Sequence, residues 1–75
     1  MMEPKPGETY RHYKRGGEYK IVCVAVIEAT KEPCVVYEAL YESAEHRFWV
    51  RPVSDFCASV ENERGDLVSR FSLSS

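Results

Sequence analysis

The sequence predicts a small all-β domain, an SH3-like barrel or roll, with an OB-like barrel as the second choice. Five or six short runs rich in β-branched and aromatic residues follow one another along the chain, and turn-forming residues separate them about every eight to twelve positions. The chain has 75 residues, 44% hydrophobic and 29% charged. That length and composition suit one domain with a small core.

The first two strands follow a short tail. Residues 1–6 contain two prolines and no apolar pattern, so we expect a loose tail there and a single domain over residues 7–75. The first strand is expected over Gly7 to Lys14. The longest is expected over Glu18 to Ala29, where β-branched residues dominate and both faces are apolar. Such a strand is typical of a small barrel, in which it bends and serves both halves of the sheet.

A β-hairpin is predicted from Cys34 to Pro52, because two β-rich runs flank the four turn-tolerant residues 42–45. In the preferred register Tyr37 lies opposite Val50. One face then carries Val35, Tyr37, Ala39, Phe48 and Val50, and the other carries Val36, Glu38, Leu40, Trp49 and Arg51. The slip that places Glu42 opposite His46 would bury the Glu38 carboxylate, at a cost of roughly several kcal/mol, and is disfavoured.

The rest of the chain predicts one helical turn and two strands. Pro52 to Cys57 is expected to form the helical turn, with Ser54 as its cap and Phe56 closing one end of the barrel. Ala58 to Glu61 and Leu67 to Leu73 are the expected last strands.

Charge and cysteine usage limit the classes of partner. The net charge of −2 disfavours a nucleic-acid backbone binder, and we interpret the basic run Arg11, His12, Lys14 and Arg15 as a solvated edge strand. Cys23, Cys34 and Cys57 form no metal-binding spacing, so we expect free thiols, no metal and no cofactor. Free thiols and the lack of a long apolar run predict a cytoplasmic protein without a membrane segment. Because the core is small, homodimerisation would be a natural supplement to stability.

The candidate ligand-binding residues centre on the hairpin. In the preferred register Trp49 and Arg51 share a face with Glu38, and Tyr10 and His12 extend the same polar and aromatic surface. An aromatic ring beside a guanidinium suits a small anionic ligand, a nucleotide or a protein segment. The structural alternative is that Trp49 covers the core and Arg51 pairs with Glu38 or Asp55.

Two other functions remain open at this point. No nucleophile elbow, phosphate-binding loop or metalloprotease motif occurs, and we assign no catalytic residue. A small enzyme would use His12 with Glu38 or Asp55 as acid–base groups. A protein-interaction or homodimer module would instead use an unpaired strand edge.

Four segments also resemble a small bacterial family catalogued as domain of unknown function 1653. They are Tyr10-Arg11-His12-Tyr13-Lys14, Gly17-x-Tyr19, Val35-Val36-Tyr37-x-Ala39-Leu40-Tyr41 and Trp49-Val50-Arg51-Pro52-x-x-x-Phe56. The resemblance spans Tyr10 to Phe71 and implies a compact β-barrel-like module of the bacterial cytoplasm, with no activity attached. Glu38 stands at a position that is often basic in the family, and the turn from Glu42 to Arg47 is longer and more polar than expected.

Overall fold

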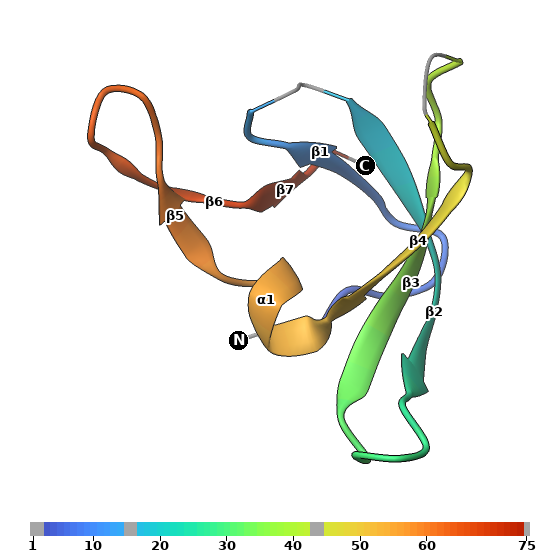
Figure 1. Ribbon diagram of the computed structural model, residues 1–75. Coiled ribbons are helices and arrows are strands. Elements are labelled where there is room, and N and C mark those ends of the chain that lie inside the picture. The colour runs from blue at the N-terminus through green and yellow to red at the C-terminus, as the bar shows by residue number, and fades with distance from the viewer. Residues whose placement is uncertain (1–2, 15–16, 43–44, 75) are drawn as a thin grey trace.

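The computed structural model describes residues 3–14, 17–42 and 45–74, which form seven strands and one short helix (Figure 1). The strands are β1 (Thr9–His12), β2 (Glu18–Val26), β3 (Pro33–Ala39), β4 (Phe48–Pro52), β5 (Ser59–Glu61), β6 (Leu67–Ser69) and β7 (Phe71–Leu73), and the helix is α1 (Val53–Phe56). The predicted all-β class is confirmed. Arg15, Gly16 and the two residues 43–44 of the predicted turns lie outside the described residues, as does the start of the predicted tail.

The strands form two sheets that do not close into a barrel. Five strands lie in the order β4-β3-β2-β1-β7, with antiparallel neighbours, and β5 pairs with β6 separately. In Figure 1 the β5–β6 pair extends away from the larger sheet, and α1 lies on the inner side between them. The described chain therefore leaves β4 and β7 as the two edges of an open sheet.

The chain passes from one sheet to the other at Arg70. The predicted single strand from Leu67 to Leu73 is in fact two strands, because β6 pairs with β5 and β7 pairs with β1. The backbone of Arg70 makes hydrogen bonds in both directions: its N–H donates to Ala58 O at 3.0 Å and its carbonyl accepts from Tyr13 N–H at 3.0 Å. These bonds satisfy the backbone where ladder pairing stops.

The hairpin register differs from the predicted one by a single residue. Tyr37 lies opposite Trp49, and Glu38 lies opposite Phe48. The β3 half of the prediction is correct, since Val35, Tyr37 and Ala39 are buried. The β4 half is wrong: Phe48 and Val50 are 56% and 61% exposed, and Trp49 and Arg51 lie on the inner face.

The core consists largely of aromatic rings. Its buried members are Tyr19, Ile21, Val35, Tyr37, Ala39, Phe56 and Phe71. Phe56 and Phe71 stack with ring centroids 4.1 Å apart and planes 4° apart, and Tyr10 meets the Phe56 ring edge-on at 5.3 Å. Phe56 is thus buried as predicted, although it fills the space between α1 and the open sheet instead of closing a barrel.

The helix α1 has no side-chain cap. Its N-cap is Pro52 and no side chain caps it with a hydrogen bond, so the predicted cap by Ser54 is wrong. The helix ends with Cys57 N–H donating to Val53 O at 3.0 Å. Among the described residues no helix has the length and apolar composition needed to cross a bilayer.

Replacing Gly17 with alanine is expected to destabilise the domain by about 1 kcal/mol. A Cβ at this position would lie 2.7 Å from Cε1 and 2.9 Å from Cδ1 of the Tyr41 ring, so the ring must move. The Tyr41 hydroxyl is 2.8 Å from the Tyr19 hydroxyl, and loss of that hydrogen bond costs about 0.5 to 1.5 kcal/mol. Urea unfolding measures the change. In a Tyr41→Ala background the same substitution should cost nothing; an equal cost there would contradict this explanation.

Candidate ligand-binding pocket

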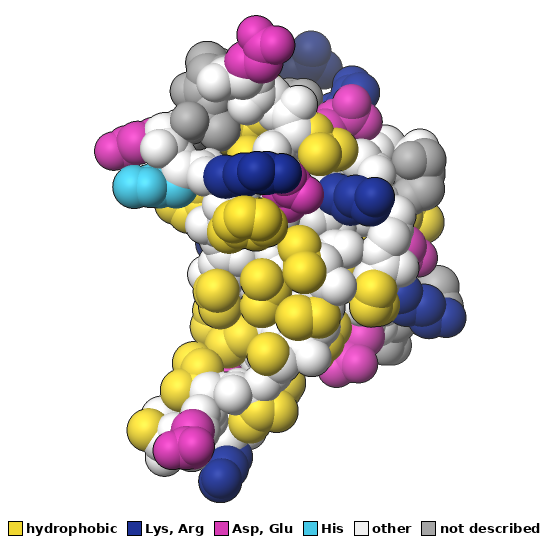
Figure 2. Space-filling view, turned by 90° about the vertical axis from the view of Figure 1, so that its right-hand side faces the viewer, with side chains coloured by type: hydrophobic (Ala, Val, Ile, Leu, Met, Phe, Trp, Pro, Cys, Tyr) yellow, Lys and Arg dark blue, Asp and Glu magenta, His cyan; other side chains and the backbone are white. Residues whose placement is uncertain are grey.

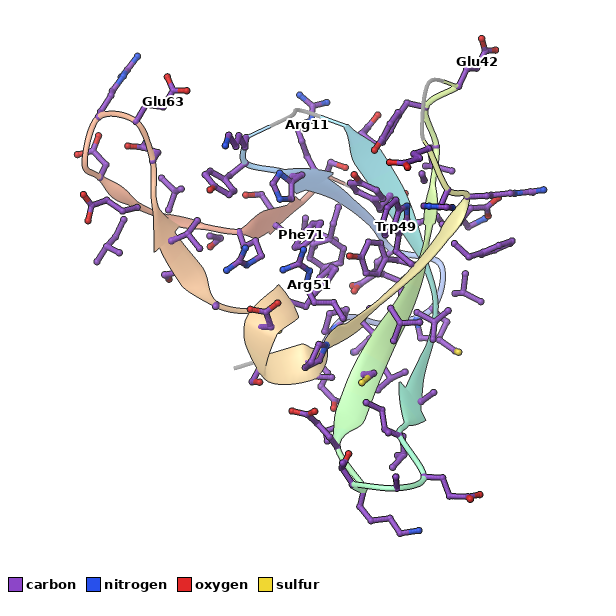
Figure 3. The ribbon with its side chains drawn as sticks, in the orientation of Figure 1. Arg11, Glu42, Trp49, Arg51, Glu63 and Phe71 are labelled. Atoms are coloured by element: carbon purple, nitrogen blue, oxygen red, sulfur yellow. The ribbon has the colours of Figure 1, made fainter. Side chains whose placement is uncertain are left out.

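A hollow of about 350 Å³ lies on the inner side of the bent sheet, within the range of small-ligand sites. Its walls are aromatic and basic: His12, Tyr13, Lys14, Tyr19, Tyr37, Tyr41, Trp49, Arg51, Arg70 and Phe71. Figure 3 shows Trp49, Arg51 and Phe71 converging on this inner side, away from Arg11, Glu42 and Glu63.

Strand alternation brings the hairpin side chains into the hollow. Because side chains on a strand alternate between faces, Trp49 and Arg51 of β4 point the same way as their cross-strand partners Tyr37 and Val35. Those two β3 residues are core residues, with exposures of 4% and 0%. The half-buried Trp49 and Arg51 therefore extend the aromatic core outward into the pocket.

Arg51 is held by three neighbours. Its Nη1 donates to Asp55 Oδ2 at 2.6 Å, its Nε donates to the Tyr37 hydroxyl at 3.4 Å, and its guanidinium carbon lies 5.8 Å from the centre of the Phe71 ring. Burial alone lowers the pKa of Arg51, but the hydrogen bonds to Tyr37 and Asp55 outweigh that effect and the pKa is raised. The guanidinium is thus charged and oriented.

A second guanidinium shares the same carboxylate. Arg70 Nη2 lies 3.6 Å from Asp55 Oδ1, and Arg70 Nε donates to the backbone carbonyl of Asp55 at 3.1 Å. Lys14 adds a third cation to the pocket wall. The pocket wall thus carries two guanidiniums, which share the Asp55 carboxylate, and one ammonium, so positive charge is in excess there although the protein has a net charge of −2.

Hydrogen bonds fix several of the pocket rings. The Trp49 indole N–H donates to His46 O at 2.9 Å, and the Tyr19 and Tyr41 hydroxyls are bonded to each other. His12 Nδ1 accepts from Lys14 N–H at 3.2 Å, and its ring meets Phe71 edge-on at 5.1 Å. Rings held in this way can present flat surfaces to a ligand with little loss of conformational entropy.

Three of the five predicted ligand-binding residues line this pocket: His12, Trp49 and Arg51. Glu38 lies on the opposite face of the sheet, where its carboxylate accepts from Arg47 Nε at 2.6 Å. The structure therefore does not bring His12 and Glu38 together as an acid–base pair.

Tyr10 does not line the pocket either. It packs on Phe56, and its hydroxyl donates to Glu8 Oε1 at 3.1 Å. Burial and this carboxylate together raise the pKa of Tyr10 to about 12, so the phenol is neutral at physiological pH.

Sequence reasoning missed Arg70, Tyr41 and Phe71 as pocket residues. Arg70 and Phe71 were assigned to one continuous strand, which gave no reason to place the guanidinium against α1. The sequence places the charged Arg70 next to the apolar Phe71 within this last β-rich run. Alternation alone does not say that the chain changes sheets at that point.

A larger hollow, of about 530 Å³, lies near the β5–β6 turn and is a weaker candidate. It is lined by Tyr13, Lys14, Glu61, Asn62, Glu63 and Arg64. Its two basic and two acidic side chains balance one another, and only one aromatic ring borders it. The amide oxygen of Asn62 already accepts the N–H groups of Arg64 and Asp66. The turn thus uses its polar groups internally.

The three cysteines are free thiols. Cys34 is buried, and Cys23 and Cys57 are half-buried. Burial and the nearby Glu3 carboxylate raise the pKa of the Cys57 thiol. Within the described parts of the chain, no three His, Cys, Asp or Glu side chains lie close enough to hold a metal ion.

The fold and the pocket define a small all-β domain with an aromatic, basic hollow on the inner face of an open sheet. The chain matches the family of proteins of unknown function DUF1653 over residues 8–73, and it belongs to that family, as the sequence resemblance predicted. It is similar to the crystal structure of a DUF1653 protein from Bordetella bronchiseptica, with 33% identity and a TM-score of 0.78. The match covers 92% of this chain and 85% of the other. No curated protein matches significantly.

Proposed function

We propose that this protein is a small cytoplasmic binding module whose pocket recognises a small organic anion that carries a planar group. The observation that carries the proposal is the sharing of Asp55 by Arg51 and Arg70 beside an aromatic wall. Guanidiniums bind carboxylate or phosphate oxygens in a planar, bidentate geometry, and aromatic rings stack on a flat ligand. Free thiols support a reducing compartment.

The size of the hollow favours a small ligand over a folded partner. About 350 Å³ accommodates a molecule of the size of a mononucleotide, and the half-buried guanidiniums lie at its wall. In this proposal the anionic group of the ligand takes the place of the Asp55 carboxylate at one or both guanidiniums. The planar group then lies against Trp49 and the neighbouring tyrosines.

The fluorescence of Trp49, the only tryptophan, reports directly on the proposed site. We expect adenosine 5′-monophosphate, used as a probe, to change this fluorescence with saturation, and uncharged adenosine to bind at least about tenfold more weakly. If adenosine and its monophosphate bind equally, or if neither binds, the anion-recognition proposal is wrong.

Asp55→Asn is expected to bind the monophosphate more tightly than the parent protein. The carboxylate competes with the ligand for both guanidiniums, and each pair is exposed enough to contribute only about 0 to 1 kcal/mol. The gain is therefore roughly two- to tenfold in affinity. The same titration measures it, with Asp66→Asn on the β5–β6 turn as a control that should leave affinity unchanged.

A further inference from the structure

Tyr37 brings a buried hydroxyl to the inner face of the larger sheet. Its side chain is 4% exposed and borders the hollow that Trp49 and Arg51 also line. The alternate residues of the hairpin face the other way, and Figure 2 shows this outer face as a hydrophobic area with charged side chains above and below it. A ligand in the hollow therefore meets Tyr37 and Arg51 from the same side of the sheet.

The Tyr37 hydroxyl has a hydrogen to donate. Its oxygen accepts from Arg51 Nε at 3.4 Å, and within the described residues no acceptor takes its own hydrogen. A hydroxyl that accepts one hydrogen bond can still donate another. The bond from the cation also polarises the O–H group, which strengthens it as a donor. The hollow thus contains a neutral donor beside its guanidiniums.

Asp55 shows which groups a carboxylate reaches at the two guanidiniums. Its Oδ2 accepts from Arg51 Nη1 at 2.6 Å and its Oδ1 lies 3.6 Å from Arg70 Nη2, so each oxygen serves one cation. Among the described residues no hydrogen bond joins Asp55 to Tyr37, although Arg51 contacts both. A carboxylate in this position therefore uses both of its oxygens and leaves the Tyr37 hydrogen without an acceptor.

We propose that the pocket selects a phosphate monoester and that the Tyr37 hydroxyl donates to its third terminal oxygen. This inference rests on the proposed function, because the anionic group takes the position of the Asp55 carboxylate. Two phosphoryl oxygens then accept from Arg51 and Arg70, as the Asp55 oxygens do, and the third accepts from Tyr37. A carboxylate lacks the third oxygen, and a site whose donor stays unpaired discriminates against such a ligand.

Two adenosine derivatives with the same planar group test this selection. We expect the parent protein to bind adenosine 5′-monophosphate at least about tenfold more tightly than adenosine 5′-carboxylate, by calorimetry at about pH 7.5, where the monophosphate is a dianion. Tyr37→Phe keeps the buried ring and the net charge. It should weaken binding of the monophosphate about tenfold further than binding of the carboxylate. Any change in the position of Arg51 affects both ligands, so the ratio of the two affinities isolates the hydroxyl.

Tyr41→Phe is the matched control. The Tyr41 side chain also lines the hollow, but its hydroxyl is 2.8 Å from the Tyr19 hydroxyl instead of a guanidinium. Its substitution should leave the preference for the monophosphate within about twofold of the parent value. Circular dichroism should show both variants folded, since each keeps its aromatic ring. The comparison of the two ligands on the parent protein holds even if a variant fails to fold.

The results separate this inference from the proposed function. Equal binding of the two anions, with both tighter than adenosine, would overturn the selection of phosphate and leave the proposed function standing. A folded Tyr37→Phe variant that keeps the parent's preference would overturn the role of the hydroxyl. If neither anion binds more tightly than adenosine, the proposed function fails and this inference fails with it.

Discussion

Replacing Phe71 with alanine should remove a large part of the domain's free energy of unfolding. The side chain is 6% exposed, stacks on Phe56 and meets the rings of Tyr19 and Tyr37 at 5.8 and 5.6 Å. Removal of a buried Phe costs about 3 to 5 kcal/mol of unfolding free energy. A 75-residue domain has only about 4 to 11 kcal/mol in total. Thermal unfolding followed by circular dichroism should show a midpoint lower by roughly 15 °C or more.

Phe48→Ala provides the matched control for this prediction. It removes the same side chain from the outer face, where 56% is exposed, and should cost about 1 kcal/mol or less. If Phe48→Ala lowers the midpoint as much as Phe71→Ala, the observed register of β4 is incorrect and the predicted one is restored.

Arg51→Gln should weaken binding of adenosine 5′-monophosphate by about 10- to 100-fold while leaving the fold intact. The substitution removes the guanidinium that Asp55 and Tyr37 orient, and with it the charge-assisted hydrogen bonds that it would donate to the phosphate. Such bonds contribute about 1.5 to 3 kcal/mol each. Its ion pair with Asp55 is partly exposed and adds little stability, so the melting temperature should fall by only a few degrees. Isothermal titration calorimetry measures the affinity without relying on Trp49.

Arg47→Gln is the control for the binding experiment. Arg47 also pairs with a carboxylate at 2.6 Å, but it does so on the opposite face of the sheet. Its substitution removes the same charge from the protein and should leave the affinity within about twofold of the parent value. Equal losses for the two variants would mean that the probe responds to net charge alone, and the pocket assignment would be wrong.

The β-rich runs and their order were predictable because β-branched and aromatic residues gather between clear turn signals. The register of the hairpin was not. Phe48, Trp49 and Val50 are consecutive apolar residues, so Tyr37 faces an apolar residue in either register, Val50 in the predicted one and Trp49 in the observed one. The cost of burying Glu38 excluded the register shift that places Glu42 opposite His46. That cost did not exclude the shift in the opposite direction, in which Glu38 stays on the outer face and pairs with Arg47.

The candidate pocket was only partly predictable for a related reason. Trp49 and Arg51 were recognised as a pair because residues two apart on a strand share a face in any register. The partners of Arg51 depend on tertiary structure: Asp55 comes from α1 and Arg70 from the point where the chain changes sheets. Local pattern gives no information about which strand pairs with which over such distances.

The position of the pocket walls also has a consequence for folding. Strands β1 and β7, which supply His12 and Phe71, lie near opposite ends of the chain, and the Ser74 hydroxyl donates to Thr9 O across 65 positions. Closing so long a loop is entropically costly and tends to come after local hairpins such as β2–β3 have formed. Because Phe71 of β7 lines the hollow, the pocket wall is incomplete until β7 has paired with β1. Under the proposed function, ligand binding would therefore require the last strand to dock.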